Sequence, residues 1–143
     1  MKINELVDIL KTGNHSLVVA KTSICTYDGR GVKDLFGLLN NEPEKIAGAM
    51  VADKIVGKGA AALLVLAHVV EVYAEVLSKP AQDLLVSAGI KTSCGMLVPY
   101  IINRAGTEMC PLETRCKDCH TAEDCLVEIS SFIEDMQIKQ GNK

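Results

Sequence analysis

The sequence predicts an α/β fold, a three-layer α-β-α sandwich built around one mixed sheet. Two β-rich segments joined by a tight polar turn come early in the chain, and later β-rich segments alternate with helical ones. In addition, 143 residues, of which 48% are hydrophobic and 23% are charged, suit one globular domain with a full core. We expect one domain over residues 1–136, followed by a flexible tail at 137–143.

The first third of the chain predicts a helix, a hairpin and a second helix. Apolar residues over 3–10 repeat with helical spacing, and Gly13 ends the segment. Residues 16–20 and 24–27 are rich in β-branched and apolar residues and flank a short polar turn, which is typical of two paired strands. A helix is expected next at 32–39, because its apolar residues fall on one face.

A long helix is expected over about 44–64, starting near Pro43. Apolar residues lie on nearly every side of it, which is typical of a helix buried all round. On such a helix Asp53, Lys54 and Lys58 would form one narrow polar stripe.

The remaining elements alternate between strand and helix, and they complete a mixed sheet covered on both faces. The expected elements are a strand at 65–74, a helix at 81–87, short strands at 90–94 and 98–102, a helix beginning near Pro111, and an amphipathic helix at 123–136.

Composition excludes some functions. The net charge of −3 and the isoelectric point near 5.6 disfavour a broad nucleic-acid surface. Three Tyr, two Phe and no Trp leave few rings on which bases could stack. The N-terminal residues have no basic region followed by an apolar run, and the apolar stretch 60–67 is too short to cross a bilayer. We therefore expect a cytoplasmic protein without a membrane partner. In a reducing cytoplasm its six cysteines are expected to be free, metal-bound or reactive in preference to forming disulfides.

Three blocks resemble the uncharacterised family known as domain of unknown function 1893, which is placed in the cytidine-deaminase-like fold superfamily. The blocks are Gly29-Arg30-Gly31-Val32, the segment 52–61 (ADKIVGKGAA) and the segment 98–113 (VPYIINRAGTEMCPLE). They span most of residues 16–113. The resemblance implies a deaminase-like fold and brings no known activity.

The same resemblance implies that the deaminase zinc centre is missing. Zinc deaminases hold their metal with one His and two Cys, from a His-Ala-Glu-like tripeptide and a Pro-Cys-x-x-Cys motif. The best matches here are Val51-Ala52-Asp53 and the segment 80–84 (PAQDL). Val51, Ala81 and Leu84 would then stand at the ligand positions, and hydrocarbon side chains cannot bind zinc.

The first candidate site is the polar stripe. Charged side chains on a buried helix are costly unless they are paired or line a wet cavity. Lys54 and Lys58 could bind a phosphate or carboxylate there, Asp53 could orient a hydroxyl or act as a base, and Arg30 could join the pocket. The alternative is a helix with one solvated edge, on which Asp53 is ion-paired to a nearby lysine.

The second candidate is the segment 103–113. Cys110 lies just before an expected helix, where backbone amides stabilise a thiolate. It could be a nucleophile or a redox thiol with Arg104 and Glu113 as neighbours, and with Asn103 and Arg104 binding the ligand. The alternative is a buried, inert cysteine and a Glu113 that caps the helix.

The third candidate is a cysteine-rich segment. Two thiolates of a Cys-x-x-Cys pair can share one metal ion, and two further cysteines could complete a tetrahedral zinc site. The four residues are Cys110, Cys116, Cys119 and Cys125. Unbound thiols and a disulfide are the alternatives.

Together these patterns favour a zinc-free deaminase-like protein that binds a small anionic or nucleotide-like ligand. Asp53, Lys54 and Lys58 would face Arg104, Cys110 and Glu113 across the pocket. The alternative is a non-catalytic interaction or redox- or metal-sensing domain that uses the cysteine-rich segment. An active zinc deaminase with cysteine ligands is a third, weaker hypothesis. The apolar face of the last helix could pack on the sheet or on a second subunit in a homodimer.

Overall fold

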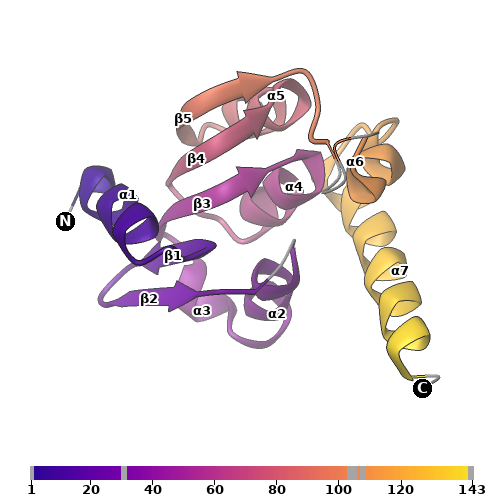
Figure 1. The fold of residues 1–143 in the computed structure, drawn as a ribbon, viewed down its shortest axis with the longest axis horizontal. Helices are drawn as coiled ribbons and strands as arrows, with labels where there is room; N and C mark the ends of the chain where they lie inside the picture. The colour runs from indigo at the N-terminus through magenta and orange to yellow at the C-terminus, as the bar shows by residue number, and fades with distance from the viewer. Residues whose placement is uncertain (1, 30–31, 103–105, 107–108, 142–143) are drawn as a thin grey trace.

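The computed structural model describes residues 2–29, 32–102, 106 and 109–141. Its sheet has five strands in the order β2-β1-β3-β4-β5 (Figure 1). Strand β1 pairs antiparallel with both β2 and β3, whereas β3, β4 and β5 are parallel, so the sheet is mixed as predicted. The strands are β1 (Leu17–Ala20), β2 (Ile24–Tyr27), β3 (Met50–Val56), β4 (Glu71–Ser78) and β5 (Lys91–Val98).

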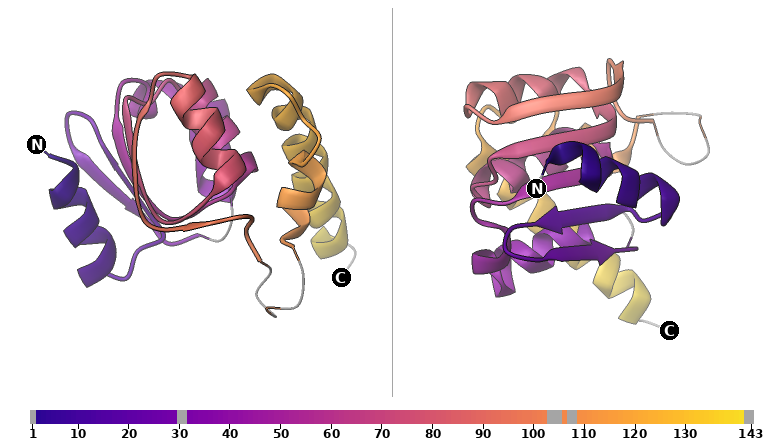
Figure 2. Two further views of the ribbon diagram at one scale, coloured as in Figure 1. Left: turned by 90° about the horizontal axis from the view of Figure 1, so that it is seen from above. Right: turned by 90° about the vertical axis from the view of Figure 1, so that its left-hand side faces the viewer.

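Helices cover both faces of the sheet, as expected. Helix α1 lies on one face, and α4 and α5 lie on the other (Figure 2, left). Helices α6 and α7 form an outer layer beyond α4, so this side of the molecule is two helices deep. The helices of the described chain are α1 (Ile3–Thr12), α2 (Lys33–Asn41), α3 (Pro43–Ile46), α4 (Lys58–Leu66), α5 (Lys79–Ser87), α6 (Pro111–Cys116) and α7 (Ala122–Gly141).

Two hydrophobic cores lie on opposite faces of the sheet. Successive side chains of a strand point to opposite faces, so neighbouring residues of one strand enter different cores. Val18 packs in the smaller core with Leu6 and Leu10 of α1. Its neighbour Val19 belongs to the larger core, together with Val51 of β3. Strand β1, which lies inside the sheet, is therefore buried on both sides.

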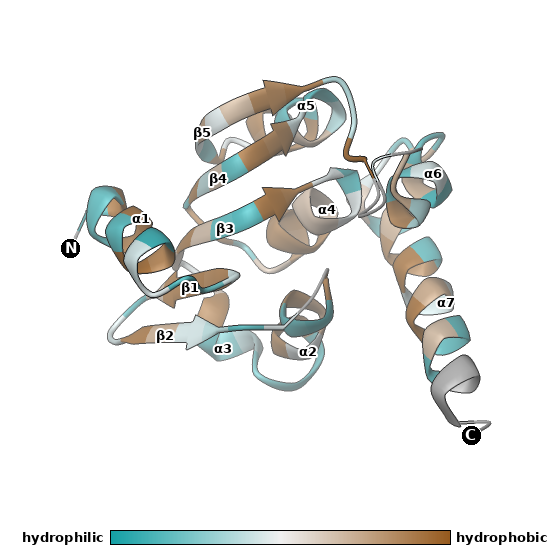
Figure 3. Ribbon diagram, in the orientation of Figure 1, coloured by the Kyte–Doolittle hydropathy of each residue, from teal (hydrophilic) through white to brown (hydrophobic). Residues whose placement is uncertain are grey.

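Helix α4 is apolar all round because it is covered on two sides. It packs between the sheet and α7, and residues 59–64 are all buried. Leu64 has no exposed surface, and neither has Ile129, which α7 contributes to the same core. Figure 3 shows the apolar character of α4 and of the neighbouring strands. The predicted helix is confirmed for residues 58–64, of which 59–64 are buried.

The predicted helix over 44–64 is nevertheless wrong for its middle part. The chain there forms α3, strand β3 and only then α4. Gly48 adopts a φ of +81°, which ends the helical segment before β3. A parallel strand with both faces covered has a continuous apolar sequence, and this pattern cannot be told from a buried helix by periodicity alone.

Two later boundaries also differ from the predictions. The strand expected at 65–74 lies at 71–78 as β4, because α4 extends to Leu66 and His68 turns the chain with a φ of +62°. The strand expected at 90–94 extends to Val98 as β5, and the strand expected at 98–102 is not formed, since Ile102 makes only an isolated bridge with Met109.

The last helix extends beyond its predicted end. Helix α7 was expected to end at Met136, but its backbone continues through Gly141. Within the described residues, no helix is both long enough and apolar enough to span a membrane.

Candidate functional site

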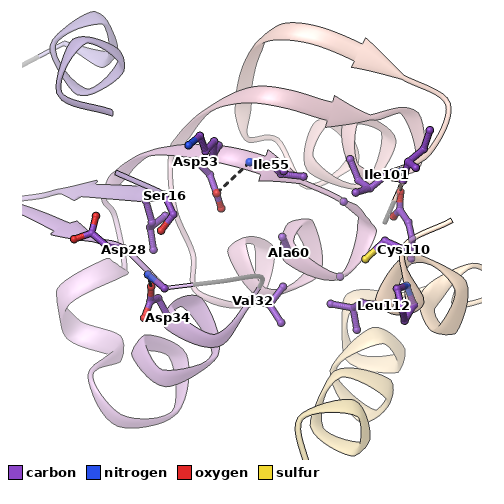
Figure 4. Close-up of a pocket in the computed structure, with 18 of the residues that line it drawn as sticks. Ser16, Asp28, Val32, Asp34, Asp53, Ile55, Ala60, Ile101, Cys110 and Leu112 are labelled. Atoms are coloured by element: carbon purple, nitrogen blue, oxygen red, sulfur yellow. Dashed lines mark hydrogen bonds between the residues drawn. The ribbon is translucent and has the colours of Figure 1, made fainter. Parts of the chain in front are cut away.

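A cavity of about 880 Å³ lies beyond the carboxyl end of β3 (Figure 4). Its walls come from the end of β3, the start of α4, the first residues of β1, the chain that follows β2, and the start of α6. The carboxyl edge of the strands is where open α/β sheets bind ligands. The fold therefore brings segments that are distant in the sequence to one ligand-sized cavity.

Asp53 lies in the wall of this cavity. In β3 it pairs with Leu17 of β1 and Ala74 of β4, and it shares the α4 face of the sheet with Val51. Its side chain points into the cavity (Figure 4), and the residue is only 9% exposed. Its Oδ1 accepts a hydrogen bond from the amide of Ile55 at 3.4 Å.

Burial raises the pKa of Asp53 from 3.8 to about 7. The amides of Ile55 and Lys54 lower it in part, and the nearby Asp34 carboxylate raises it further. Near neutral pH, Asp53 is thus present both with and without its proton. A group of this kind can accept or donate a proton within a cavity.

Two more carboxylates line the cavity, and both were missed in the sequence. Asp34, at the start of α2, accepts a hydrogen bond from the amide of Gly29 at 2.9 Å. Asp28, just after β2, lies 2.7 Å from Nδ1 of His15. The sequence feature that could have pointed to them is Asp28-Gly29, but an Asp-Gly pair after a strand indicates only a turn.

Glu113 has a structural role at the same cavity. Its Oε1 accepts a hydrogen bond from the amide of Lys58 at 2.6 Å, and its Oε2 accepts one from the amide of Ile101 at 2.7 Å. The carboxylate therefore caps the N-terminus of α4, although it belongs to α6. A Cβ on Gly57 would lie 3.0 Å from Glu113 Oε1, so the close approach requires the glycine. Capping by Glu113 was foreseen, but for a different helix.

Cys110 also lines the cavity, across from Asp53. It is the residue before α6, and its sulfur points toward the hollow (Figure 4). Asp53, Lys54, Cys110 and Glu113 are thus the sequence-predicted residues that the structure brings to one cavity.

The predicted stripe of Asp53, Lys54 and Lys58 does not exist. Asp53 and Lys54 are consecutive in a strand, so they point to opposite faces. The Lys54 ammonium donates a hydrogen bond to Asn14 Oδ1 at 3.2 Å. Lys58 instead turns away from the cavity, and its ammonium donates to the carbonyls of Lys117 and Cys119.

Three predicted ligand-binding residues, Arg30, Asn103 and Arg104, lie outside the described residues. Among the described residues that line the cavity, Lys54 is the one cation, whereas four are carboxylates, namely Asp28, Asp34, Asp53 and Glu113. The described wall is therefore acidic, which differs from the anion-binding pocket expected from the lysines.

The cysteine-rich segment divides in two. Cys116 and Cys125 are buried in the main core and Cys119 packs against it, whereas Cys110 lines the cavity. Over residues 2–29, 32–102, 106 and 109–141, no group of three or more His, Cys, Asp or Glu is placed to hold a metal ion.

The residues matched to the deaminase ligands also offer no donor atoms. Val51 is fully buried in β3, and Ala81 and Leu84 lie in α5. Hydrocarbon side chains in these places do not fit a zinc ion.

The fold and the cavity define a small α/β domain with a ligand-sized pocket at the carboxyl edge of a mixed sheet. The chain belongs to the family described as domain of unknown function DUF1893, whose model matches residues 5–133. The crystal structure of a DUF1893 family protein, TM1506 from Thermotoga maritima, is similar to this one with a TM-score of 0.83 and 25% sequence identity. The similarity covers 90% of this chain and 88% of that one. No curated protein matches the chain.

Proposed function

We propose that this protein binds a small polar molecule of nucleoside-like size in the cavity at the end of β3. The observation that carries the proposal is Asp53, a residue that is only 9% exposed and whose carboxyl group is directed into a ligand-sized cavity. Cavities of about 300–1,000 Å³ suit small organic ligands, and this one has about 880 Å³. A few polar groups in a mainly apolar wall are the usual means of orienting such a ligand.

The charge of the described wall favours hydrogen-bond donors on the ligand. Asp28, Asp34 and Asp53 are acceptors when ionised, and they would repel a phosphate group. Amino and hydroxyl groups, such as those of a nucleobase or a sugar, would instead be attracted. A nucleoside-like molecule is therefore favoured over the small anionic or nucleotide-like ligand that was expected from the sequence.

Asp53 would also supply the chemistry of the pocket. With a pKa of about 7, it can take a proton from a bound hydroxyl or amino group, or give one to it, near neutral pH. Cys110 stands on the opposite wall and could contact the other side of the ligand. The protein would thus bind its ligand between a titrating carboxyl and a thiol.

We also propose that the scaffold is cytidine-deaminase-like and has no zinc centre of the deaminase kind. The mixed five-stranded sheet that begins with a hairpin supports this relation. Val51, Ala81 and Leu84 support the loss of the metal, because none has a ligand atom. Water activation by a metal held at these positions is not part of the proposed function.

The test is a thermal-shift titration with cytidine, adenosine, their 5′-monophosphates and inorganic phosphate at pH 6, 7 and 8. We expect at least one nucleoside to raise the Tm in a concentration-dependent manner, and inorganic phosphate to leave it unchanged. Asp53→Asn should weaken the binding at least about tenfold, because the side-chain nitrogen of Asn, unlike the second oxygen of Asp, cannot accept a hydrogen bond. The exposed Asp8→Asn is the matched control and should bind like the wild type. A stronger shift with phosphate than with any nucleoside, or unchanged binding by Asp53→Asn, would contradict the proposal.

A further inference from the structure

We propose that the cavity selects ligands that carry ribose, and that Asp34 is the residue that recognises the two neighbouring hydroxyl groups of this sugar. The inference rests on the proposed function, because it takes a nucleoside-like molecule as the ligand. It adds to that function the kind of sugar and the side chain that distinguishes it from 2′-deoxyribose.

The described lining of the cavity is polar at one end and apolar at the other. Figure 4 shows the polar side chains where β1 and the chain after β2 reach β3, and the apolar ones toward α4 and α6. The polar group is Ser16, Asp28, Asp34 and Asp53, and the apolar group is Val32, Ala60, Ile101 and Leu112. A nucleoside has the same division, since its sugar carries hydroxyl groups and its base has two broad π-faces. The sugar therefore belongs at the polar end and the base at the apolar end.

Several polar groups of this lining already have partners within the chain. The two oxygens of Glu113 each accept a hydrogen bond from a backbone amide. The Ser16 hydroxyl donates to the carbonyl of Tyr27 at 2.9 Å. Asp28 lies 2.7 Å from His15 Nδ1, and its side chain is 71% exposed, so water competes for its other oxygen. These groups therefore have little capacity left to bind a sugar.

Asp34 differs from them because one of its oxygens is held and the other is left for a ligand. Its Oδ2 accepts a hydrogen bond from the amide of Gly29 at 2.9 Å, and no other group of the described chain donates to this carboxylate. A Cβ on Gly29 would overlap Oδ2, so the carboxylate rests directly on the glycine backbone. Asp34 also lies in the first turn of α2, where free backbone amides stabilise a negative charge. It is thus a fixed acceptor in the cavity wall, and a fixed group loses little conformational entropy when a ligand binds.

The neighbouring hydroxyl groups of ribose match a carboxylate of this kind. An ionised carboxylate offers about four lone-pair positions, of which the Gly29 amide uses one, so two hydroxyl groups can each donate to Asp34. A 2′-deoxyribose has one donor fewer, and an acceptor that the ligand shields from water then remains unpaired. Sites built to hydrogen-bond a substrate hydroxyl reject the analogue that lacks it. Asp34 therefore favours ribonucleosides over 2′-deoxyribonucleosides.

Isothermal titration calorimetry of the full-length protein at pH 7 tests this selection. The probes are two matched pairs, adenosine with 2′-deoxyadenosine and cytidine with 2′-deoxycytidine. We expect the ribonucleoside of at least one pair to bind at least about tenfold more tightly than its deoxy partner. In Asp34→Asn this ratio should fall below about threefold, because Asn keeps an oxygen for the Gly29 amide and presents to the sugar a nitrogen that cannot accept a hydrogen bond.

The matched control is Asp83→Asn, whose side chain is exposed on α5 and does not line the cavity, and it should keep the wild-type ratio. Circular dichroism shows whether each variant is folded, and the ratio of the wild type needs no variant. Equal affinities within both pairs would overturn this inference and leave the proposed function standing. A wild-type ratio in folded Asp34→Asn would overturn the role of Asp34. Absence of binding by all four nucleosides would overturn the proposed function together with this inference.

Discussion

At the scale of single residues, Asp53 shows how a pocket changes the chemistry of an ordinary side chain. An aspartate in water is ionised above a pH of about 4. In β3 the same residue lies between the neighbouring strands β1 and β4. Because it is buried there and Asp34 is nearby, its pKa rises to about 7. The protein keeps a group that is unfavourable when ionised, which is typical of functional positions.

This shift in pKa predicts how stability depends on pH. Between pH 3.8 and about 7 the folded state holds a proton on Asp53 that the unfolded state has released. The proton on Asp53 therefore stabilises the folded state fully below about pH 3.8. This stabilisation is lost as the pH rises from there through about 7, and the free energy of unfolding falls by up to about 4 kcal/mol. In Asp53→Asn this part of the pH dependence should disappear, so the variant gains stability relative to the wild type as the pH rises.

Urea unfolding at half-unit steps from pH 4 to pH 8 measures this effect. The control is Asp8→Asn, whose side chain is exposed in α1 and which should follow the wild type at every pH. Parallel curves for the wild type and Asp53→Asn would show that Asp53 titrates normally in the folded protein.

At the scale of elements, Glu113 joins three segments. It belongs to α6, caps the start of α4, and binds the amide of Ile101 in the chain that leaves β5. Both carboxylate oxygens are used, and the residue is only 5% exposed. The side chain therefore fixes one wall of the cavity.

Replacing Glu113 by Gln should destabilise the protein. The amide nitrogen of Gln cannot accept a hydrogen bond, so one buried backbone amide would lose its partner, at a cost of about 1–3 kcal/mol. The negative charge at the N-terminus of α4 would also be lost. Urea unfolding at pH 7 measures the change, and the exposed Glu134→Gln on α7 should stay within about 0.5 kcal/mol of the wild type. If Glu113→Gln is as stable as Glu134→Gln, the two hydrogen bonds do not hold α6 to the start of α4 and to Ile101.

At the scale of the whole molecule, the outer layer made by α7 completes the main core. Helix α4 is apolar on every side and needs a partner on the face turned away from the sheet. Helix α7 supplies that partner through Ile129 and the partly buried Leu126 and Phe132. The apolar face that could have served a homodimer is thus used mainly within the chain, and Met136 is its exposed end.

Two substitutions on α7 test this role. Ile129→Ala should lower the free energy of unfolding by about 2–5 kcal/mol, because it leaves a cavity against α4. Val127→Ala removes methyl groups from a residue that is 68% exposed. It should change the free energy of unfolding by less than about 0.5 kcal/mol. Chemical denaturation of both variants gives the comparison. Equal effects of the two would indicate that α7 does not pack on α4 in solution.

Local patterns in the sequence were sufficient for much of the fold. The hairpin, the mixed sheet and the helices at either end follow from short-range spacing of apolar residues and from turn residues, and the structure has them. The family was also visible, because its motif blocks are continuous in sequence. The kinds of chemistry available, a buried carboxylate and several thiols, were visible as well.

Only the tertiary structure decided how these groups are arranged. An apolar run such as 50–56 forms a strand here because β1 and β4 pair with it, and no local period distinguishes this outcome from a helix. Because residues 50–56 form a strand and not part of a helix, Asp53 and Lys58 do not share one face, and only Asp53 lines the cavity. Glu113 meets the amide of Lys58 although 55 residues separate them, since burial and backbone pairing act between segments that are distant along the chain.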